Sequence, residues 1–153
     1  MNILQGVKIV SITPPAAIVD NASFTTAAVD TIGFGKVAIV FSLGATDIAM
    51  TALKLQESDD SGMSGATDIT GFVVGTSTDP DTAIASVLPS ATDDNKFVVF
   101  YVSLQGRKRY IDLVATAGDG TAGTFATAFA LLYAADTYPS TAATRGALLN
   151  LIG

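Results

Sequence analysis

The chain of 153 residues contains no cysteine, no histidine and no tryptophan. Without histidine or cysteine it cannot form a Ser–His–Asp triad, a cysteine nucleophile or a zinc site of the usual nitrogen and sulfur ligands. The common protein ligands of haem and iron–sulfur clusters are missing as well. No disulfide can form, so cysteine usage indicates no particular redox compartment. These absences remove most enzyme classes, and we predict no catalytic residues, no cofactor and no metal centre.

Positive charge is also scarce. Eight Lys and Arg residues stand against 14 Asp and Glu residues, which gives a net charge of −6 and a pI of about 4.2. An acidic surface repels phosphate groups, so we expect neither nucleic acid nor an anionic membrane face as a partner. The first residues show no basic segment followed by an apolar one, so no signal peptide is predicted. The longest apolar stretch, residues 124–135, is about half of the ~20 residues that a membrane-spanning helix needs.

Glutamate is nearly absent, because Glu57 is the only one, and there are five lysines. Helix surfaces favour Glu, Lys, Gln and Arg, whereas the abundant Thr (19 residues), together with Val and Ile, favours strands. The length fits one domain, and no linker, heptad or repeat divides it. We therefore predict an all-β fold with a single β-sandwich domain, jelly-roll-like and mostly antiparallel, over residues 1–153. Residues 1–6 and 140–153 are candidate docking arms.

Short β-branched or alternating runs between turn residues predict the individual strands. They cover residues 7–12, 24–30, 36–43, 51–58, 69–74, 96–104 and 107–116. The nearly continuous apolar residues of 36–43 predict a strand that is covered on both faces. Gln105 and Gly106 predict a hairpin between the two runs that flank them. Residues 124–133 place large apolar residues at helical spacing, but their threonines and the preceding Gly-rich turn favour a strand, with a helix as the alternative.

Two groups of residues suggest chemistry and also have a plain structural explanation. The pairs Asp59-Asp60, Asp79-Pro80-Asp81 and Asp93-Asp94 offer oxygen ligands for Ca²⁺, but they lack the EF-hand pattern. Because Asp side chains accept hydrogen bonds from nearby backbone N–H groups, we predict that these residues form turns. The Gly-rich residues 118–123 lack the Gly-Lys-Ser/Thr ending of a phosphate loop, so they are also predicted to form a turn.

Docking surfaces are the more informative candidates. The run Arg107-Lys108-Arg109 holds three of the eight positive charges; it either blocks edge pairing at a strand end or contacts an acidic neighbouring subunit. The apolar ends of the chain either close the sandwich or add to another subunit. The candidate interface residues are therefore Ile3, Leu4, Arg107, Lys108, Arg109, Leu148, Leu149, Leu151 and Ile152. The mean hydropathy of +0.48 is typical of a subunit that buries faces against its neighbours.

Five segments carry a resemblance to small structural proteins of tailed bacteriophages. They are AIVDNA (17–22), LGATDIA (43–49), LKLQESDD (53–60), LPSATDDNKF (88–97) and GRKRYIDL (106–113). The chain most resembles a head decoration (cement) protein of the virion. That resemblance implies a homo-oligomer, with a trimer favoured, that is made in the bacterial cytoplasm and binds the outer surface of the phage head. Its partner would be the major capsid protein, whose neighbouring subunits it would clamp.

A second resemblance supports an alternative function. The strand LKLQES with its acidic turn resembles the lectin-type jelly rolls of phage appendages. It implies a tail or head-fibre module that binds a host glycan or another virion protein. The absence of tryptophan counts against sugar binding, because aromatic platforms such as Trp commonly stack on sugars.

Overall fold

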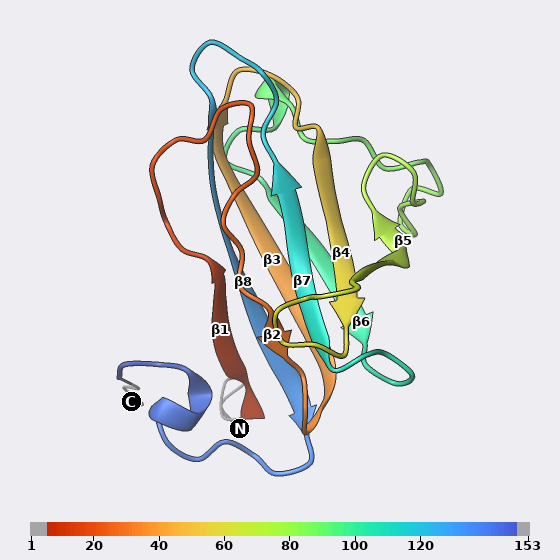
Figure 1. Cartoon of the computed structure of the whole chain (residues 1–153), viewed down its shortest axis with the longest axis vertical. Helices are drawn as coiled ribbons and strands as arrows, with labels where there is room; N and C mark the ends of the chain where they lie inside the picture. Colours follow the sequence, from red (N-terminus) through yellow and green to blue (C-terminus); the bar gives the residue numbers. More distant parts are fainter. Residues whose placement is uncertain (1–5, 150–153) are drawn as a thin grey trace.

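The computed structural model describes residues 6–149 and consists of two four-stranded antiparallel sheets that face each other (Figure 1). This arrangement confirms the predicted all-β sandwich. The strands are β1 (Lys8–Thr13), β2 (Val29–Asp30), β3 (Phe34–Thr46), β4 (Ala52–Ser58), β5 (Thr67–Val73), β6 (Phe97–Ser103), β7 (Tyr110–Thr116) and β8 (Thr124–Ala135). Two short 3₁₀ turns, η2 (Ala91–Asp93) and η3 (Ala143–Arg145), precede β6 and follow β8. Within residues 6–149 we find no helix long and apolar enough to cross a membrane.

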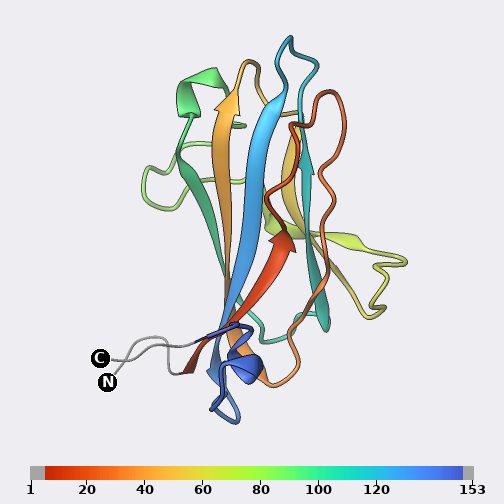
Figure 2. The same cartoon turned by 90° about the vertical axis from the view of Figure 1, so that its left-hand side faces the viewer.

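The order of the strands interleaves the two sheets. Sheet A is ordered β1-β8-β3-β6 and sheet B is ordered β2-β7-β4-β5. Apart from β4 and β5, successive strands of the chain lie in opposite sheets, so most connections cross the ends of the sandwich. Figure 2 shows the two layers nearly edge-on, with β3, β6 and β8 on one side and β5 and β7 on the other.

The core fills the space between the sheets and follows from the alternation of each strand. On β3 the side chains of Val37, Ile39, Phe41 and Leu43 are buried, and they belong to one core cluster with buried leucines and isoleucines of β4 and β7. On β8 every second residue from 124 to 132 is buried, and three of these residues are small: Ala126, Ala128 and Ala130. These alanines leave room for the larger side chains of the opposite layer.

The hairpin predicted at Gln105 and Gly106 is wrong. Strand β6 pairs with β3, whereas β7 pairs with β2 and β4, so the link between them crosses from sheet A to sheet B. The physical reason lies in the residues after the turn. The backbone N–H of Lys108 donates to Glu57 of β4 (3.2 Å), and Arg109 binds Asp30 of β2. These contacts draw the chain onto sheet B.

Two other predictions of strands have mixed outcomes. Residues 124–133 form a strand, as favoured over a helix, and β8 pairs with both β1 and β3. The strand predicted at 24–30 is reduced to Val29–Asp30. The N–H of Phe24 donates to Ala115 of β7, but that of Ala27 donates to Ile12 of β1 in the opposite sheet. A segment that divides its hydrogen bonds between two layers cannot form one continuous ladder.

Candidate functional site: the open face of sheet A and the surrounding loops

One Asp of each predicted cluster accepts hydrogen bonds within its own turn, whereas Asp94 accepts the N–H of Thr46 on β3. Asp60 Oδ1 accepts the N–H of Gly62 at 2.8 Å, and Asp79 Oδ1 accepts the N–H of Asp81 at 2.8 Å. Asp93 accepts the N–H of Ser90 at the start of η2, and Lys96 pairs with it at 3.0 Å. These contacts with Ser90 and Lys96 lower the pKa of Asp93. The prediction of turns is thus confirmed for Asp60, Asp79 and Asp93.

The Gly-rich turn 118–123 is held by two carboxylates from other loops. Asp47 accepts the backbone N–H groups of Thr121 and of Ala122 (2.7 Å), and Asp20 accepts that of Gly120 at 3.0 Å. The donating N–H groups of Ala122 and Thr121 lower the pKa of Asp47. A side chain at position 120 would overlap the Asp47 carboxylate, so this close approach requires glycine. The N–H groups that a phosphate would need already bind carboxylates of the same chain.

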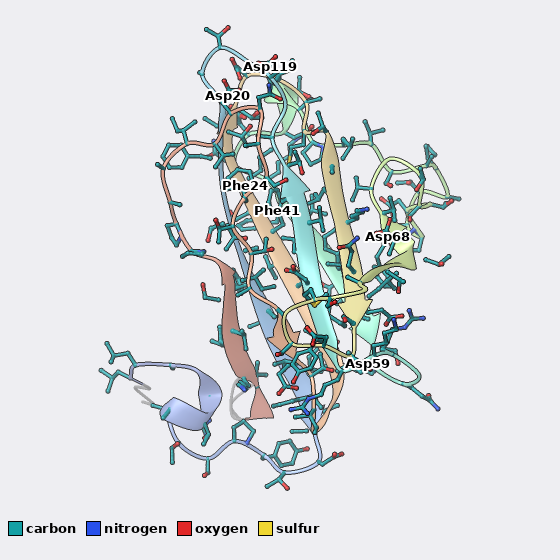
Figure 3. All side chains as sticks on the ribbon, viewed as in Figure 1. Asp20, Phe24, Phe41, Asp59, Asp68 and Asp119 are labelled. Carbon is teal, nitrogen blue, oxygen red and sulfur yellow. The ribbon has the colours of Figure 1, made fainter. Side chains whose placement is uncertain are left out.

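The acidic side chains are spread around the molecule. Asp20 and Asp119 lie near one end of the sandwich, Asp59 near the other, and Asp68 beside β5 (Figure 3). Within the described part of the chain, no three acidic residues come together in a way that would hold a metal ion. The carboxylates therefore serve as local hydrogen-bond acceptors and as the partners of nearby lysines and arginines.

The basic run is largely engaged with carboxylates of its own chain. Arg109 forms two hydrogen bonds with Asp30, at 2.9 and 2.8 Å, and Arg107 pairs with Glu57 at 3.3 Å. The hydrogen bond from Arg109 lowers the pKa of Asp30. Lys108 contributes its backbone N–H to Glu57. The run thus joins the β6–β7 link to sheet B, and an intersubunit role for Arg107, Lys108 and Arg109 stays a prediction.

The candidate docking arms are described only in part. Leu148 and Leu149 are 102% and 67% exposed and follow η3. The turn at Gly146, with φ +71°, lies so close to Ile9 of β1 that any side chain there would overlap the Ile9 carbonyl. This contact fixes the described part of the C-terminal arm beside the start of β1. The other four predicted interface residues, Ile3, Leu4, Leu151 and Ile152, lie outside the described residues.

An extended apolar surface lies on the outer side of sheet A, which we call the open face. It consists of the outward side chains Ile9, Ser11, Lys36, Ala38, Val40, Ser42, Phe97, Val99, Tyr101, Ser103, Phe125, Thr127, Phe129, Leu131 and Tyr133. Their inward neighbours on the same strands are buried in the core. Phe97, Tyr101 and Phe125 are 65%, 69% and 46% exposed. Single exposed apolar residues are normal on a protein surface, but these side chains are contiguous, which is typical of an interaction surface.

The register of the strands places these side chains in rows across the sheet. Ile9, Leu131, Ala38 and Tyr101 lie opposite one another on β1, β8, β3 and β6. The next row is Ser11, Phe129, Val40 and Val99. In these two rows the residues of the inner strand β3 are Ala38 and Val40, and larger side chains, Leu131, Phe129 and Tyr101, lie beside them. The open face is therefore a largely apolar surface, which also contains Ser11, Lys36, Ser42, Ser103 and Thr127.

Sequence reasoning missed the open face, although a signal for it was present. The nearly continuous apolar run 36–43 predicts a strand covered on both faces; on the outward side the structure buries Ala38 (6% exposed) and leaves Val40 and Ser42 half-buried. Val37, Ile39 and Phe41 point into the core, whereas Ala38 and Val40 point outward. No second layer of residues 6–149 covers that outward side in the strand order of the two sheets. The run 96–104 is also apolar on both sides of the strand, and Phe97, Val99 and Tyr101 of this run lie on the open face.

A shallow pocket lies beside β5. It has a volume of about 430 Å³ and is lined by Asp68, Thr70, Gly71, Val73, Thr76 and Ser77. Several of its polar groups are already engaged: Asp68 binds Lys54 and Gln56, and the Ser77 hydroxyl accepts the N–H of Val73. No aromatic side chain is among the lining residues.

No protein-family model matches the chain, and neither the curated proteins nor the solved structures contain a significantly similar one.

Proposed function

We propose that this chain is a structural binding protein and not an enzyme. Its function would be that of a capsid decoration (cement) protein, which binds the outer surface of a phage head and stabilises the shell by clamping major-capsid subunits. The open face is the observation that supports the proposal best. A large, mostly apolar surface outside the core is typical of a protein that covers that surface in an assembly.

The mechanism of such a protein is binding alone. A clamp that binds the assembled shell and not free subunits stabilises the shell by mass action. Several identical contacts made by one homo-oligomer, for which the resemblance to decoration proteins favours a trimer, add through their effective concentration. A sandwich without the residues of a catalytic triad or a zinc site is sufficient for this task.

We also assign the finer topology of the sandwich as a jelly roll. The order β1-β8-β3-β6 opposite β2-β7-β4-β5 supports the assignment. It brings strands far apart in the chain into one sheet and sends most connections across the ends, as expected for an eight-stranded barrel built from two Greek keys.

The exposed C-terminal residues are the proposed contact with the shell. Leu148 and Leu149 are exposed, and the C-terminal segment that carries them lies beside the start of β1, at the end of the sandwich where β8 also ends (Figure 1). An apolar end of this kind can pack onto a neighbouring protein or add to one of its sheets. The open face would then remain for another contact.

The test is binding to empty heads of the phage whose genome encodes the chain. Heads without the protein are mixed with the wild-type chain, with Leu149→Asp or with Val87→Asp, and pelleted through a sucrose cushion. Val87 is 82% exposed and lies far along the chain from the arm, so it controls for the added charge. We expect saturable binding of the wild type and of Val87→Asp, and weak binding of Leu149→Asp. Absence of wild-type binding would refute the proposed function.

The alternative is a tail or head-fibre module that binds a host glycan or another virion protein. The pocket beside β5 is the place where a sugar would fit by size and polarity. Its lining lacks the aromatic platform on which sugars commonly stack, and Asp68 is engaged by Lys54 and Gln56. Specific binding in a glycan-array screen, lost in Thr70→Ala, would favour this alternative over the capsid clamp.

A further inference from the structure

We infer that the open face of sheet A is the surface through which copies of this chain associate, so that its occupant is a second copy of the chain. This inference rests on the proposed function in one respect, because both require a protein that acts in an assembly. It adds the identity of the surface and of its partner.

The distribution of charge is the first argument. The strands of sheet A have 6, 13, 7 and 12 residues, together 38, and none is Asp or Glu. Lys8 and Lys36 are their only charged residues, so these strands carry +2 and the rest of the chain carries −8 of the net −6. Two copies of an acidic protein repel each other wherever their carboxylates meet. On sheet A they can approach without bringing carboxylates together.

Sheet B does not offer the same opportunity. Its strands carry Asp30, Lys54, Glu57, Asp68 and Asp112, several of them in ion pairs on the surface. Covering that side would require these charges to lose water. The centres of protein interfaces are depleted in charged residues and enriched in aromatic ones, which describes sheet A and not sheet B.

The size of the open face is the second argument. With strands about 4.8 Å apart and a rise of about 3.3 Å per residue, 38 residues cover roughly 600 Å² of flat sheet. Side chains corrugate that plane and increase its accessible area, so the face is comparable with the roughly 800 Å² per partner of a standard interface. A second copy can cover this area, wholly in a face-to-face dimer or in part where each copy meets two neighbours in a trimer.

The shape of the face is the third argument. Ala38, Val40 and Ser42 on β3 form a line of small side chains, and each has a larger neighbour on at least one side: Leu131 and Tyr101, Phe129, and Phe97, respectively. The large side chains of a second copy, such as Phe129 and Tyr101, can lie over this line. Interdigitation of this kind is how sheets pack about 10 Å apart in the cores of β-sandwiches. Homo-oligomers are also the commonest assemblies of soluble proteins.

The experiment measures the native mass without any phage head present, so its outcome is independent of shell binding. Wild type, Tyr101→Asp and Phe97→Asp are compared by sedimentation equilibrium over a wide range of concentration. Ile84→Asp is the matched control: Ile84 is 66% exposed, against 65% for Phe97 and 69% for Tyr101, and it lies outside sheet A. All three variants gain one negative charge. Circular dichroism and thermal melts establish that each variant is folded.

We expect the wild type and Ile84→Asp to sediment at the same multiple of 15.6 kDa. For Tyr101→Asp and Phe97→Asp we expect the dissociation constant to rise by roughly 30-fold or more, as for a hot-spot residue. If either Asp variant fails to fold, Tyr101→Ser replaces it. A wild type of 15.6 kDa at every concentration would overturn the inference. So would an oligomer that these substitutions leave intact, because its contact would lie elsewhere.

Discussion

Two phenylalanines on strand β6 provide a sharp test of the fold. Phe100 points into the core and is 6% exposed, whereas Phe97, three residues earlier, points outward and is 65% exposed. Phe100 also packs edge-on against Phe72 of β5, with ring centroids 6.3 Å apart. Replacing each by alanine removes the same atoms from the same strand. The difference between the two variants therefore reports which face of β6 is buried.

The expected magnitudes follow from burial. Loss of a buried Phe side chain costs about 3–5 kcal/mol, including the cavity that it leaves. Phe97 has about a third of its surface covered, so Phe97→Ala should cost about 1 kcal/mol. In a domain of this size, 1 kcal/mol shifts Tm by about 2–4 °C. We thus expect Phe100→Ala to lower Tm by roughly 6–20 °C and Phe97→Ala by roughly 2–4 °C.

The assay is differential scanning calorimetry of both variants in a Tyr101→Asp background, in which the open face is not expected to associate. This background separates the stability of the sandwich from that of the assembly. Equal losses of Tm, or a larger loss for Phe97→Ala, would refute the account. A shift of the β6 register by one residue would exchange its two faces and produce that result.

Three further predictions concern charge, metal and the chain ends. Burial raises the pKa of Asp112, so its charged form disfavours folding at neutral pH. Asp112→Asn should therefore raise Tm at pH 7, and the gain should vanish as the pH falls through the raised pKa of Asp112 towards the ordinary pKa of an Asp side chain. Tm measured against pH for both proteins checks this, and a gain that persists in acid would contradict it. EDTA should leave Tm unchanged, since backbone N–H groups already occupy the Asp acceptors; a fall of several degrees would revive a cation site. Deleting residues 148–153 or 1–5 should weaken head binding without unfolding the domain, and unchanged head occupancy would show that the deleted end is not the anchor.

The fold class was predictable because it depends on composition and period. The scarcity of Glu and Lys and the alternation of runs such as 51–58 indicate strands, and β4 follows this prediction closely. Residues 124–133 were harder, since large side chains at 125, 129 and 132 have helical spacing. The inward positions of β8 from 124 to 130 are small alanines and a threonine, and only Leu132 is large, so side-chain size does not reveal the alternation of buried and exposed positions.

The pairing of strands was not predictable from local signals. Gln105 and Gly106 have the composition of a two-residue hairpin, and Gly106 does adopt φ +76°. What sends the chain to the other sheet is the pairing of Arg109 with Asp30, 79 residues away in sequence, and of Lys108 with Glu57, 51 residues away. Such long-range contacts cannot be predicted from the residues near the turn alone.

The existence of a covered apolar face was predictable from the sequence, but the strands that form it were not. High hydropathy and few charges predict a subunit with a covered face, and the carboxylate-free runs of β3 and β6 are visible in the sequence. Whether these runs form one surface depends on which strands share a sheet. Once β1, β8, β3 and β6 are neighbours, separate apolar residues become one surface.

The absence of cysteine allows a direct measurement of whether the open face is covered. Single thiols are introduced as Tyr101→Cys and Ile84→Cys, at positions 69% and 66% exposed in the isolated chain, and their alkylation rates are compared under native and unfolding conditions. The account predicts that the thiol at 101 reacts far more slowly than the thiol at 84 in the native protein, and that the two rates agree after unfolding. Equal native rates at the two positions would contradict it.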